Sequence, residues 1–418
     1  MTPAIKCLIL LAIVALLFVT EMIPLAMTAI GASVACYALG LVPENQIFLG
    51  LADSTVVLFG GMFVVGAAMF YTGLAQKIGG GVVRMFGKGE NSLMFGIMII
   101  AALMSAVLSN TGTTACLIPV VMGICANAKI SASRELMPLA FAAGLGGTIT
   151  LIGTPPNILA NVALKAAGMP ELQFGFFEYA WIGIPITIAG IVYMMFIGKY
   201  LLPEDSGTLN LEIDEEILEN ETSTQKQIIC GIIMVGVIGS MATGIVPLEI
   251  AAVVGAVIAV LTGCLTEKQA YNSIDWVTIF LFAGMIPVAT AMNTSGAGKL
   301  IAEATVKMLG GDPSPYMVTA VLFGLAVVLT QFMSNTASKA LLCPVGIALS
   351  AQMGASPKAV LMAILIASSC AFASPVGTPP NTLVLGPGGY KFMDYLKAGT
   401  GLVAVCLIVS IIVIPIVW

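Results

Sequence analysis

The sequence predicts an all-α integral membrane protein made of two inverted repeats, each with five transmembrane helices and a re-entrant hairpin. Of its 418 residues, 59% are hydrophobic and only 9% are charged, whereas a soluble domain carries about 25% charge. Apolar segments long enough to cross a bilayer recur along the whole chain. Two polar motifs that interrupt these segments each occur twice, at nearly the same separation.

Each half of the chain contains five apolar segments of spanning character. In the first half, residues 1–202, they lie at 3–19, 25–42, from about 55, 136–165 and 181–200. In the second half, residues 227–418, they lie at 228–243, 247–265, 277–292, 359–385 and 398–417. An odd number of crossings turns the second copy upside down. This plan, with broken helices at the bilayer midplane, is typical of secondary transporters.

A Ser-Asn-Thr motif at residues 109–111 recurs at 334–336, an offset of 225 residues. The first copy separates apolar pieces at 92–108 and 113–126, each too short to cross about 30 Å comfortably. We therefore expect a re-entrant hairpin over about 92–126, and its counterpart over about 317–351.

A Gly-Thr-Pro-Pro-Asn motif breaks a later apolar segment of each half, at 153–157 and at 377–381. Glycine ends helices in a left-handed conformation, threonine caps the next helix, and proline is tolerated at its first position. The glycines should therefore present carbonyl oxygens, and the threonines should start new helices. The residues expected to line an anion site here are Thr154, Thr378 and Pro379.

Together the four breaks suit an anion and cations. The end of a half-helix offers carbonyl oxygens that attract cations, and the start of the next offers free N–H groups that attract carboxylates. Oxygen ligands are those that hard cations such as Na⁺ prefer. A single break often only kinks a helix, but four breaks paired by an internal repeat indicate one shared site.

Residues 203–226 form an acidic, polar linker between the halves. Lysine and arginine are commoner on the loops that share a side with this linker. The positive-inside rule therefore places the linker in the cytoplasm and the N-terminus outside. We expect a multi-pass protein of the cell membrane, in contact with lipid.

Several function classes are disfavoured by what the sequence lacks. There is no histidine, which removes the usual metal ligand and the usual proton switch near neutral pH. The nine cysteines show neither metal-binding spacing nor a disulfide framework. No clustered carboxylates occur in an apolar segment, so we expect no enzyme, no organic cofactor and no nucleic-acid partner. A channel or sensor is a more distant alternative.

At the Ser-Asn-Thr and Thr-Pro-Pro motifs the chain resembles the divalent-anion/sodium symporter family of the ion transporter superfamily, whose members carry dicarboxylates, citrate or sulfate. The resemblance covers nearly the whole chain. It implies a homodimer and an elevator-type motion of the transport domain. It also implies that the two hairpin tips contact the substrate carboxylates through Asn110, Thr111, Asn335 and Thr336.

The resemblance further implies two sodium sites. The first would use Ser105, Ser109, Asn110 and Gly153. The second would use Thr330, Asn335 and the carbonyl oxygens of Met333 and Gly377. Ser105 and Thr330 each stand five residues before the tip asparagine.

Lys339 departs from the repeat, because the first half has Thr114 at the equivalent place. A lysine at this depth is costly in a membrane and is a functional candidate by default. It would supply charge to the substrate, replace a cation, or extend into a water-filled vestibule.

These observations predict a sodium-coupled symporter of a small divalent anion, most simply a C4-dicarboxylate such as succinate or malate. Its partners would be the dianion, two or more Na⁺ ions and a second copy of the chain. One alternative on the same fold is a sodium-independent dicarboxylate exchanger, with Lys339 in place of a cation. Others are a sulfate or citrate transporter, a Na⁺/H⁺ antiporter and an arsenite permease.

Overall fold

The structure is a computed structural model that describes residues 1–85, 89–203, 223–308 and 314–418. Throughout these ranges the regular structure is helical, without a strand, so the all-α prediction is confirmed. Most of the acidic linker predicted at 203–226 lies outside the described residues, at 204–222.

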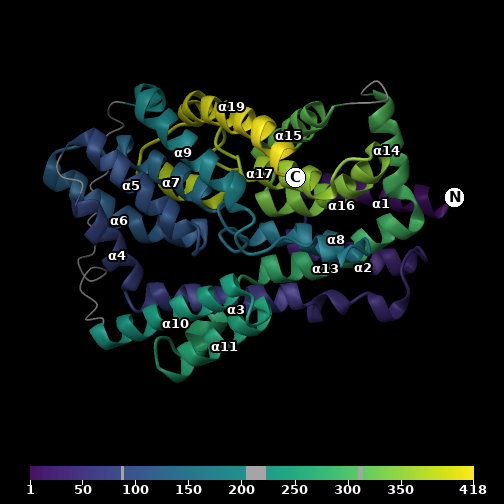
Figure 1. Ribbon diagram of the computed structural model, residues 1–418, viewed down its shortest axis with the longest axis horizontal. Coiled ribbons are helices and arrows are strands. Elements are labelled where there is room, and N and C mark those ends of the chain that lie inside the picture. Colours follow the sequence, from purple (N-terminus) through teal and green to yellow (C-terminus); the bar gives the residue numbers. More distant parts are fainter. Residues whose placement is uncertain (86–88, 204–222, 309–313) are drawn as a thin grey trace.

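The described helices follow the order of the predicted segments, and Figure 1 shows their arrangement. In the first half they are α1 (Pro3–Thr20), α2 (Leu25–Ala38), α3 (Ser54–Tyr71), α4 (Leu74–Met85), α5 (Glu90–Ser105), α6 (Asn110–Ala128), α7 (Leu136–Gly146), α8 (Leu159–Ala166) and α9 (Ala180–Phe196). In the second half they are α10 (Thr224–Thr243), α11 (Leu248–Leu261), α12 (Glu267–Ser273), α13 (Trp276–Ser295), α14 (Ala297–Met308), α15 (Pro315–Phe332), α16 (Asn335–Met353), α17 (Pro357–Ala367), α18 (Pro379–Leu385) and α19 (Phe392–Val417). Short 3-10 helices connect them: η1 (Glu44–Gln46), η2 (Leu49–Ala52), η3 (Ala132–Arg134), η4 (Pro155–Ile158), η5 (Pro170–Leu172) and η6 (Gly198–Leu201).

Local sequence explains where many helices begin and end. The Ser314 hydroxyl accepts a hydrogen bond from the Met317 backbone N–H at the start of α15, where proline takes the first helical position. A serine followed by proline starts α17 in the same way. At their other ends, α10 and α13 stop at Gly244 and Gly296, whose φ angles are +68° and +80°. Only glycine adopts this conformation without strain.

Seven stretches of the described chain are long and apolar enough to cross a membrane, as expected for a multi-pass protein. They are α1, residues Glu44–Tyr71, α6, α10, α13, α15 and α19. Two of them, α6 with 19 residues and α15 with 18, are arms of the predicted hairpins. The shortness expected of both arms of the first hairpin is therefore wrong for α6, and the re-entrant path remains a prediction.

The two halves pack into each other. The helix α2 lies along α13, and α3 lies along α11. Glycines allow the backbones to approach closely: a Cβ added at Gly284 would lie 2.5 Å from the Ala29 carbonyl carbon, and one at Gly61 would lie 2.7 Å from that of Ala252. Small residues at helix contacts are typical of membrane proteins, where packing replaces the hydrophobic effect as the driving force.

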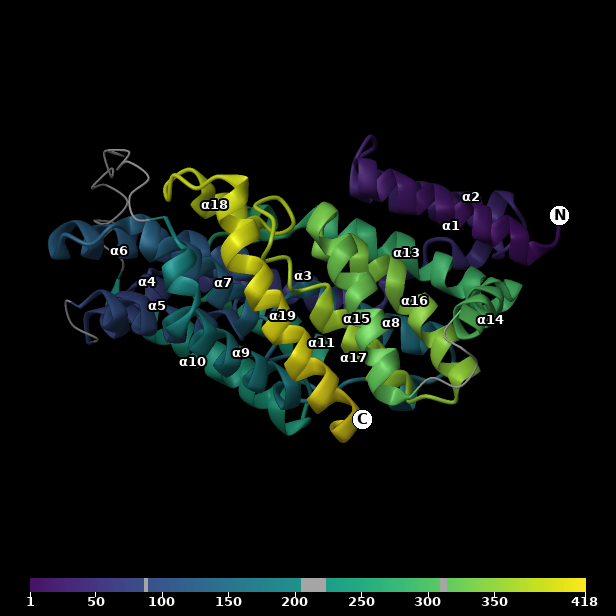
Figure 2. The ribbon, with the colours of Figure 1, turned by 90° about the horizontal axis from the view of Figure 1, so that it is seen from above.

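Helices α5 and α6 lie on one side of the molecule and α15 and α16 on the other, as Figures 1 and 2 both show. The broken segments join these groups crosswise. Helix α6 of the first half packs against α18 of the second, and α16 of the second packs against η4 and α8 of the first. This exchange brings residues more than 160 positions apart in sequence to the same place.

Candidate functional site

The two Ser-Asn-Thr motifs form equivalent helix starts. Ser109 is the N-cap of α6 and accepts from the Gly112 N–H at 3.1 Å. Ser334 is the N-cap of α16 and accepts from the Ala337 N–H at 3.2 Å. One N–H of each first turn is therefore satisfied by its cap, and the preceding N–H groups remain available for a ligand.

The broken segments also start new helices where the sequence predicts, but they do so differently in detail. Thr154 and Thr378 occupy the N-cap positions of η4 and α18, and prolines follow at the first helical positions. Neither threonine makes a side-chain cap hydrogen bond. Their hydroxyl groups are therefore not committed to the helix starts.

The left-handed conformation predicted for Gly153 and Gly377 is wrong, because neither is among the positive-φ residues of the described chain. Close approach explains both glycines instead. A Cβ at Gly153 would lie 3.0 Å from the Ser105 carbonyl oxygen, and one at Gly377 would lie 2.6 Å from that of Thr330. Each glycine thus lets a broken segment touch the last turn before a hairpin tip.

Each broken segment is closed by an asparagine at the end of its motif. The Asn157 amide donates to the backbone carbonyls ten and seven residues earlier, at 3.2 and 3.0 Å. The Asn381 amide donates to carbonyls at the same two separations, both at 2.9 Å. The hydroxyls of Tyr179 and Tyr395 donate to the carbonyls of Asn157 and Asn381. The two breaks therefore share one hydrogen-bonding plan.

A cluster of oxygen atoms surrounds the tip asparagine of the first half. The end of the Asn110 amide that meets Ser105 Oγ at 2.6 Å also lies 3.1 Å from the Gly153 carbonyl oxygen and 3.3 Å from that of Ala143. An NH₂ group at this position would donate to both carbonyls, whereas an oxygen there would share a cation with them. Neutral oxygens in this arrangement suit a hard monovalent cation.

The second half repeats the cluster. One end of the Asn335 amide lies 2.8 Å from Thr330 Oγ1, 2.9 Å from the Ser368 carbonyl oxygen and 3.2 Å from that of Gly377. Ser368 follows Ala143 by 225 residues, the offset between the hairpin tips. The two oxygen clusters therefore arise from the same local structure.

The tips and the broken segments meet around one cavity of about 480 Å³. Its wall includes residues 109–112 and 334–336 from the tips, and residues 154–156 and 378–380 from the breaks. The predicted substrate residues that line it are Asn110, Thr111, Thr154, Asn335, Thr336, Thr378 and Pro379. The structure thus gathers polar groups from both halves into one site.

Two of the predicted cation ligands have other contacts in the structure. The Ser109 hydroxyl lines the cavity but serves as a helix cap, so it is not part of the Asn110 cluster. Met333 is the buried C-cap of α15, and its N–H donates to the Leu329 carbonyl at 3.1 Å. Ligation by Ser109 and by the Met333 carbonyl remains a prediction.

Lys339 does not line the cavity and does not reach a vestibule, because its side chain is completely buried. The ammonium donates to Asn157 Oδ1 at 2.9 Å and to Ser369 Oγ at 2.7 Å. It therefore links the hairpin of the second half to both broken segments. In this conformation it makes no direct contact with a ligand in the cavity.

Sequence reasoning missed three features of the site. The carbonyls of Ala143 and Ser368 carry no side-chain signal, although the repeat offset relates them. No role for Asn157 follows from the sequence, although it ends the first Gly-Thr-Pro-Pro-Asn motif. Asp275, the N-cap of α13, lines the cavity from a helix outside all four motifs.

Comparisons with known proteins agree with this architecture. Residues 15–342 match a family model described as citrate transporter. An uncharacterized transporter of Haemophilus influenzae is 31% identical, over 96% of this chain and 89% of that protein. Sodium-dependent high-affinity dicarboxylate transporter 3 of Caenorhabditis elegans is 25% identical, over 97% of this chain and 82% of that protein. The crystal structure of the Alcanivorax borkumensis YdaH transporter shares the fold, with a TM-score of 0.67 at 16% identity, covering 100% of this chain and 98% of that one.

Proposed function

From the premise that this chain belongs to the citrate transporter family, we propose that it is a sodium-coupled symporter of a small divalent anion. A C4-dicarboxylate such as succinate or malate is the substrate that we favour. Membership of the family makes the chain a multi-pass membrane transporter and not an enzyme. The identity of the anion and the coupling ion are the proposal.

The observation that carries the proposal is the pair of matching oxygen clusters beside one cavity. Each cluster joins a tip asparagine to a hydroxyl and to backbone carbonyls of a broken segment. The starts of α6 and α16 face the same cavity. The helix starts would bind the two carboxylates, and a Na⁺ ion in each cluster would supply balancing charge.

No arginine is among the residues that line the cavity. A dianion there would depend on cations bound nearby, because helix starts supply only partial charges. Cations should therefore bind first, and anion affinity should rise steeply with Na⁺ concentration. The sodium-dependent dicarboxylate transporter named among the relatives supports this choice of ion and anion.

The sodium-independent exchanger is less well supported. The Lys339 ammonium contacts Asn157 and Ser369, not the amide of Asn110 or Asn335. It therefore does not occupy the place of a cation in either cluster. Citrate or sulfate is the second candidate substrate, because the matching family is described as citrate transporters.

We also propose that transport uses an elevator motion within two inverted repeats and that the protein works as a homodimer. The packing of α2 on α13 and of α3 on α11 would form a static scaffold. The crossed hairpins and broken segments would move as one body and carry both clusters with the anion. Cross-linking α3 to α6 through introduced cysteines would then block transport reversibly, and a cross-link from α3 to α11 would not.

The test of function is uptake of labelled succinate into proteoliposomes. With a Na⁺ gradient directed inward, succinate should accumulate above its external concentration. Replacement of Na⁺ by K⁺ or choline should remove the accumulation. Accumulation that is equal in all three salts would reject sodium coupling. Exchange against internal succinate alone would establish the exchanger.

A further inference from the structure

Lys339 is a buried basic side chain that makes no ion pair with an acidic side chain of the described residues. Its exposed fraction is 0%, and both of its acceptors are neutral. The ion pairs of the described residues involve other basic side chains. Burying an uncompensated charge is strongly unfavourable, even after the protein relaxes. A charged lysine at this place therefore requires a countercharge that offsets the unfavourable burial.

The equivalent place in the first half shows that the fold itself does not need this charge. Thr114 precedes Lys339 by 225 residues, the offset of the repeat. Asn381, the equivalent of Asn157, has a buried Oδ1 without a hydrogen-bond partner, and the Thr114 hydroxyl is buried and unpartnered as well. One of the two matching positions thus carries an ammonium. The other carries a threonine, and the broken segment with Asn381 keeps its hydrogen bonds without a positive charge.

The position of Lys339 relative to the cavity indicates where a countercharge would bind. Its acceptor Asn157 directly follows residues 154–156, which form part of the cavity wall. The ammonium therefore lies just behind that wall, and no water reaches it. Charges in such a medium interact more strongly than in water, because little solvent screens them. An anion bound in the cavity would balance the lysine.

We propose that Lys339 is the fixed positive charge through which the cavity distinguishes a doubly charged anion from a singly charged one. This inference rests on the proposed function, because it requires an anion in the cavity. The lysine acts through space and through the segment that Asn157 closes. Its contribution should therefore grow with the charge of the ligand, whereas a purely structural lysine would affect all ligands alike.

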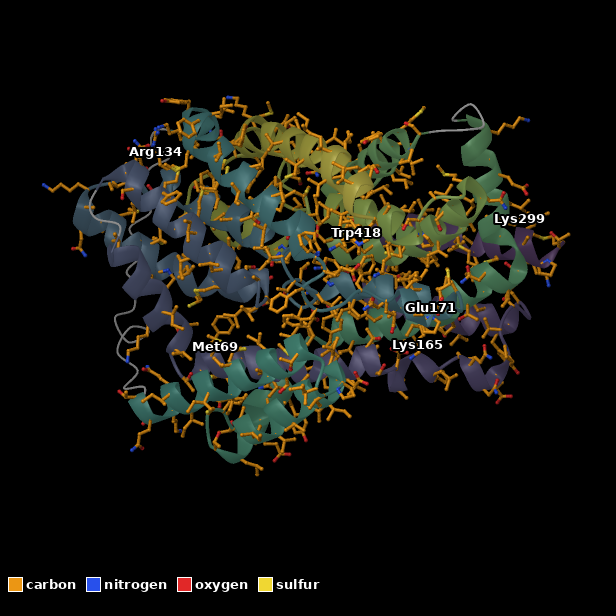
Figure 3. The ribbon with its side chains drawn as sticks, viewed as in Figure 1. Met69, Arg134, Lys165, Glu171, Lys299 and Trp418 are labelled. Atoms are coloured by element: carbon orange, nitrogen blue, oxygen red, sulfur yellow. The ribbon has the colours of Figure 1, made fainter. Side chains whose placement is uncertain are left out.

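The test compares binding of succinate and of monomethyl succinate, at pH 7.5 and saturating Na⁺, to purified protein in detergent. In Lys339→Gln, succinate affinity should fall at least about tenfold, and affinity for the monoester should fall less than about threefold. Lys339→Arg should keep the wild-type ratio of the two affinities. Lys299→Gln is the control, because that lysine is exposed and lies at the right-hand end of the molecule in Figure 3.

A second variant covers the case in which Lys339→Gln does not fold. Ser369→Asp places a carboxylate beside the ammonium and neutralises it locally, so the preference for succinate should fall as before. An unchanged ratio in either folded variant, or equal losses for both ligands, overturns the inference while the proposed function stands. Wild-type protein that binds neither ligand would reject the proposed function together with this inference.

Discussion

In the first half, the Gly-Thr-Pro-Pro-Asn motif ends at Asn157. The Asn157 amide donates to two backbone carbonyls, and its oxygen accepts from the Lys339 ammonium. In the second half, the motif ends at Asn381. The Asn381 amide donates to the equivalent carbonyls, and its buried oxygen has no hydrogen-bond partner. The backbone architecture is therefore common to both halves, while the charge is not. The shared hydrogen bonds follow the repeated motif, and the difference lies where we propose a role for Lys339.

The strongest test of the shared architecture is to remove each tip asparagine in turn. Asn110→Ala and Asn335→Ala should each lower Na⁺-driven uptake by about 100-fold or more, since each removes a cluster oxygen and a cavity group together. Proteoliposome uptake measures the effect. Asn127→Ala, at an exposed position near the end of the same helix α6, should change uptake little. Strong loss in only one tip variant would contradict equivalent roles.

Replacement of the buried carboxyl group of Glu135, in the first half, should alter how the free energy of unfolding depends on pH. Glu135 directly precedes α7, is fully buried, and has no hydrogen-bond partner for its carboxylate oxygens. Burial raises the pKa of Glu135 to about 8; nearby Glu90 adds to the rise, and Arg134 opposes it. The equivalent residue of the second half is Val360, 225 positions later.

The folded protein holds a proton on Glu135 that the unfolded chain has released above its ordinary pKa of 4.5. Stability should therefore fall as pH rises from about 4.5 to about 8. Glu135→Gln should match the wild type near pH 5 and be more stable at pH 9, by on the order of 3 to 5 kcal/mol. Thermal unfolding in detergent at both pH values is the measurement. The exposed Glu171→Gln serves as control, and a pH-independent difference would contradict the assignment.

The close contacts of the two break glycines provide a third comparison. Gly153→Ala and Gly377→Ala should each cost about 1 to 3 kcal/mol of stability, because the added Cβ would press on backbone oxygen. The second should cost at least as much, since its Cβ would also lie 2.9 Å from Ala371 Cβ. Apparent melting temperature and its rise with Na⁺ would be measured. Gly123→Ala, with nothing within 4 Å of the new Cβ, should be neutral or stabilising.

The smallest expected effect compares the N-cap aspartates of α3 and α13. Asp53 pairs with Lys165 at 2.7 Å, whereas Asp275 lines the cavity. Asp275→Asn should lower the KM for succinate about threefold, because it removes negative charge beside the bound anion. Asp53→Asn should leave KM unchanged. A rise in KM for Asp275→Asn would instead indicate that Asp275 helps to bind a cation.

Much of the site was predictable because polar residues in apolar helices are rare and therefore informative. The positions of both tips and both breaks, and the proline-led helix starts, follow from local sequence. The left-handed conformation predicted for Gly153 was wrong because glycine has two uses, and here close approach to Ser105 decides. The length of α6 was underestimated, because this helix begins at the tip asparagine itself.

The sequence by itself determined that the chain is a helical membrane protein with two related halves and four interrupted segments. Hydrophobic length and repeated motifs carry that information directly. Only the tertiary structure decided that the carbonyls of Ala143 and Ser368 join the clusters, that Asp275 faces the cavity, and that Lys339 turns behind its wall. These features depend on contacts between segments that are distant in sequence. Every residue has a backbone carbonyl, so residue type does not indicate which carbonyls join a cluster.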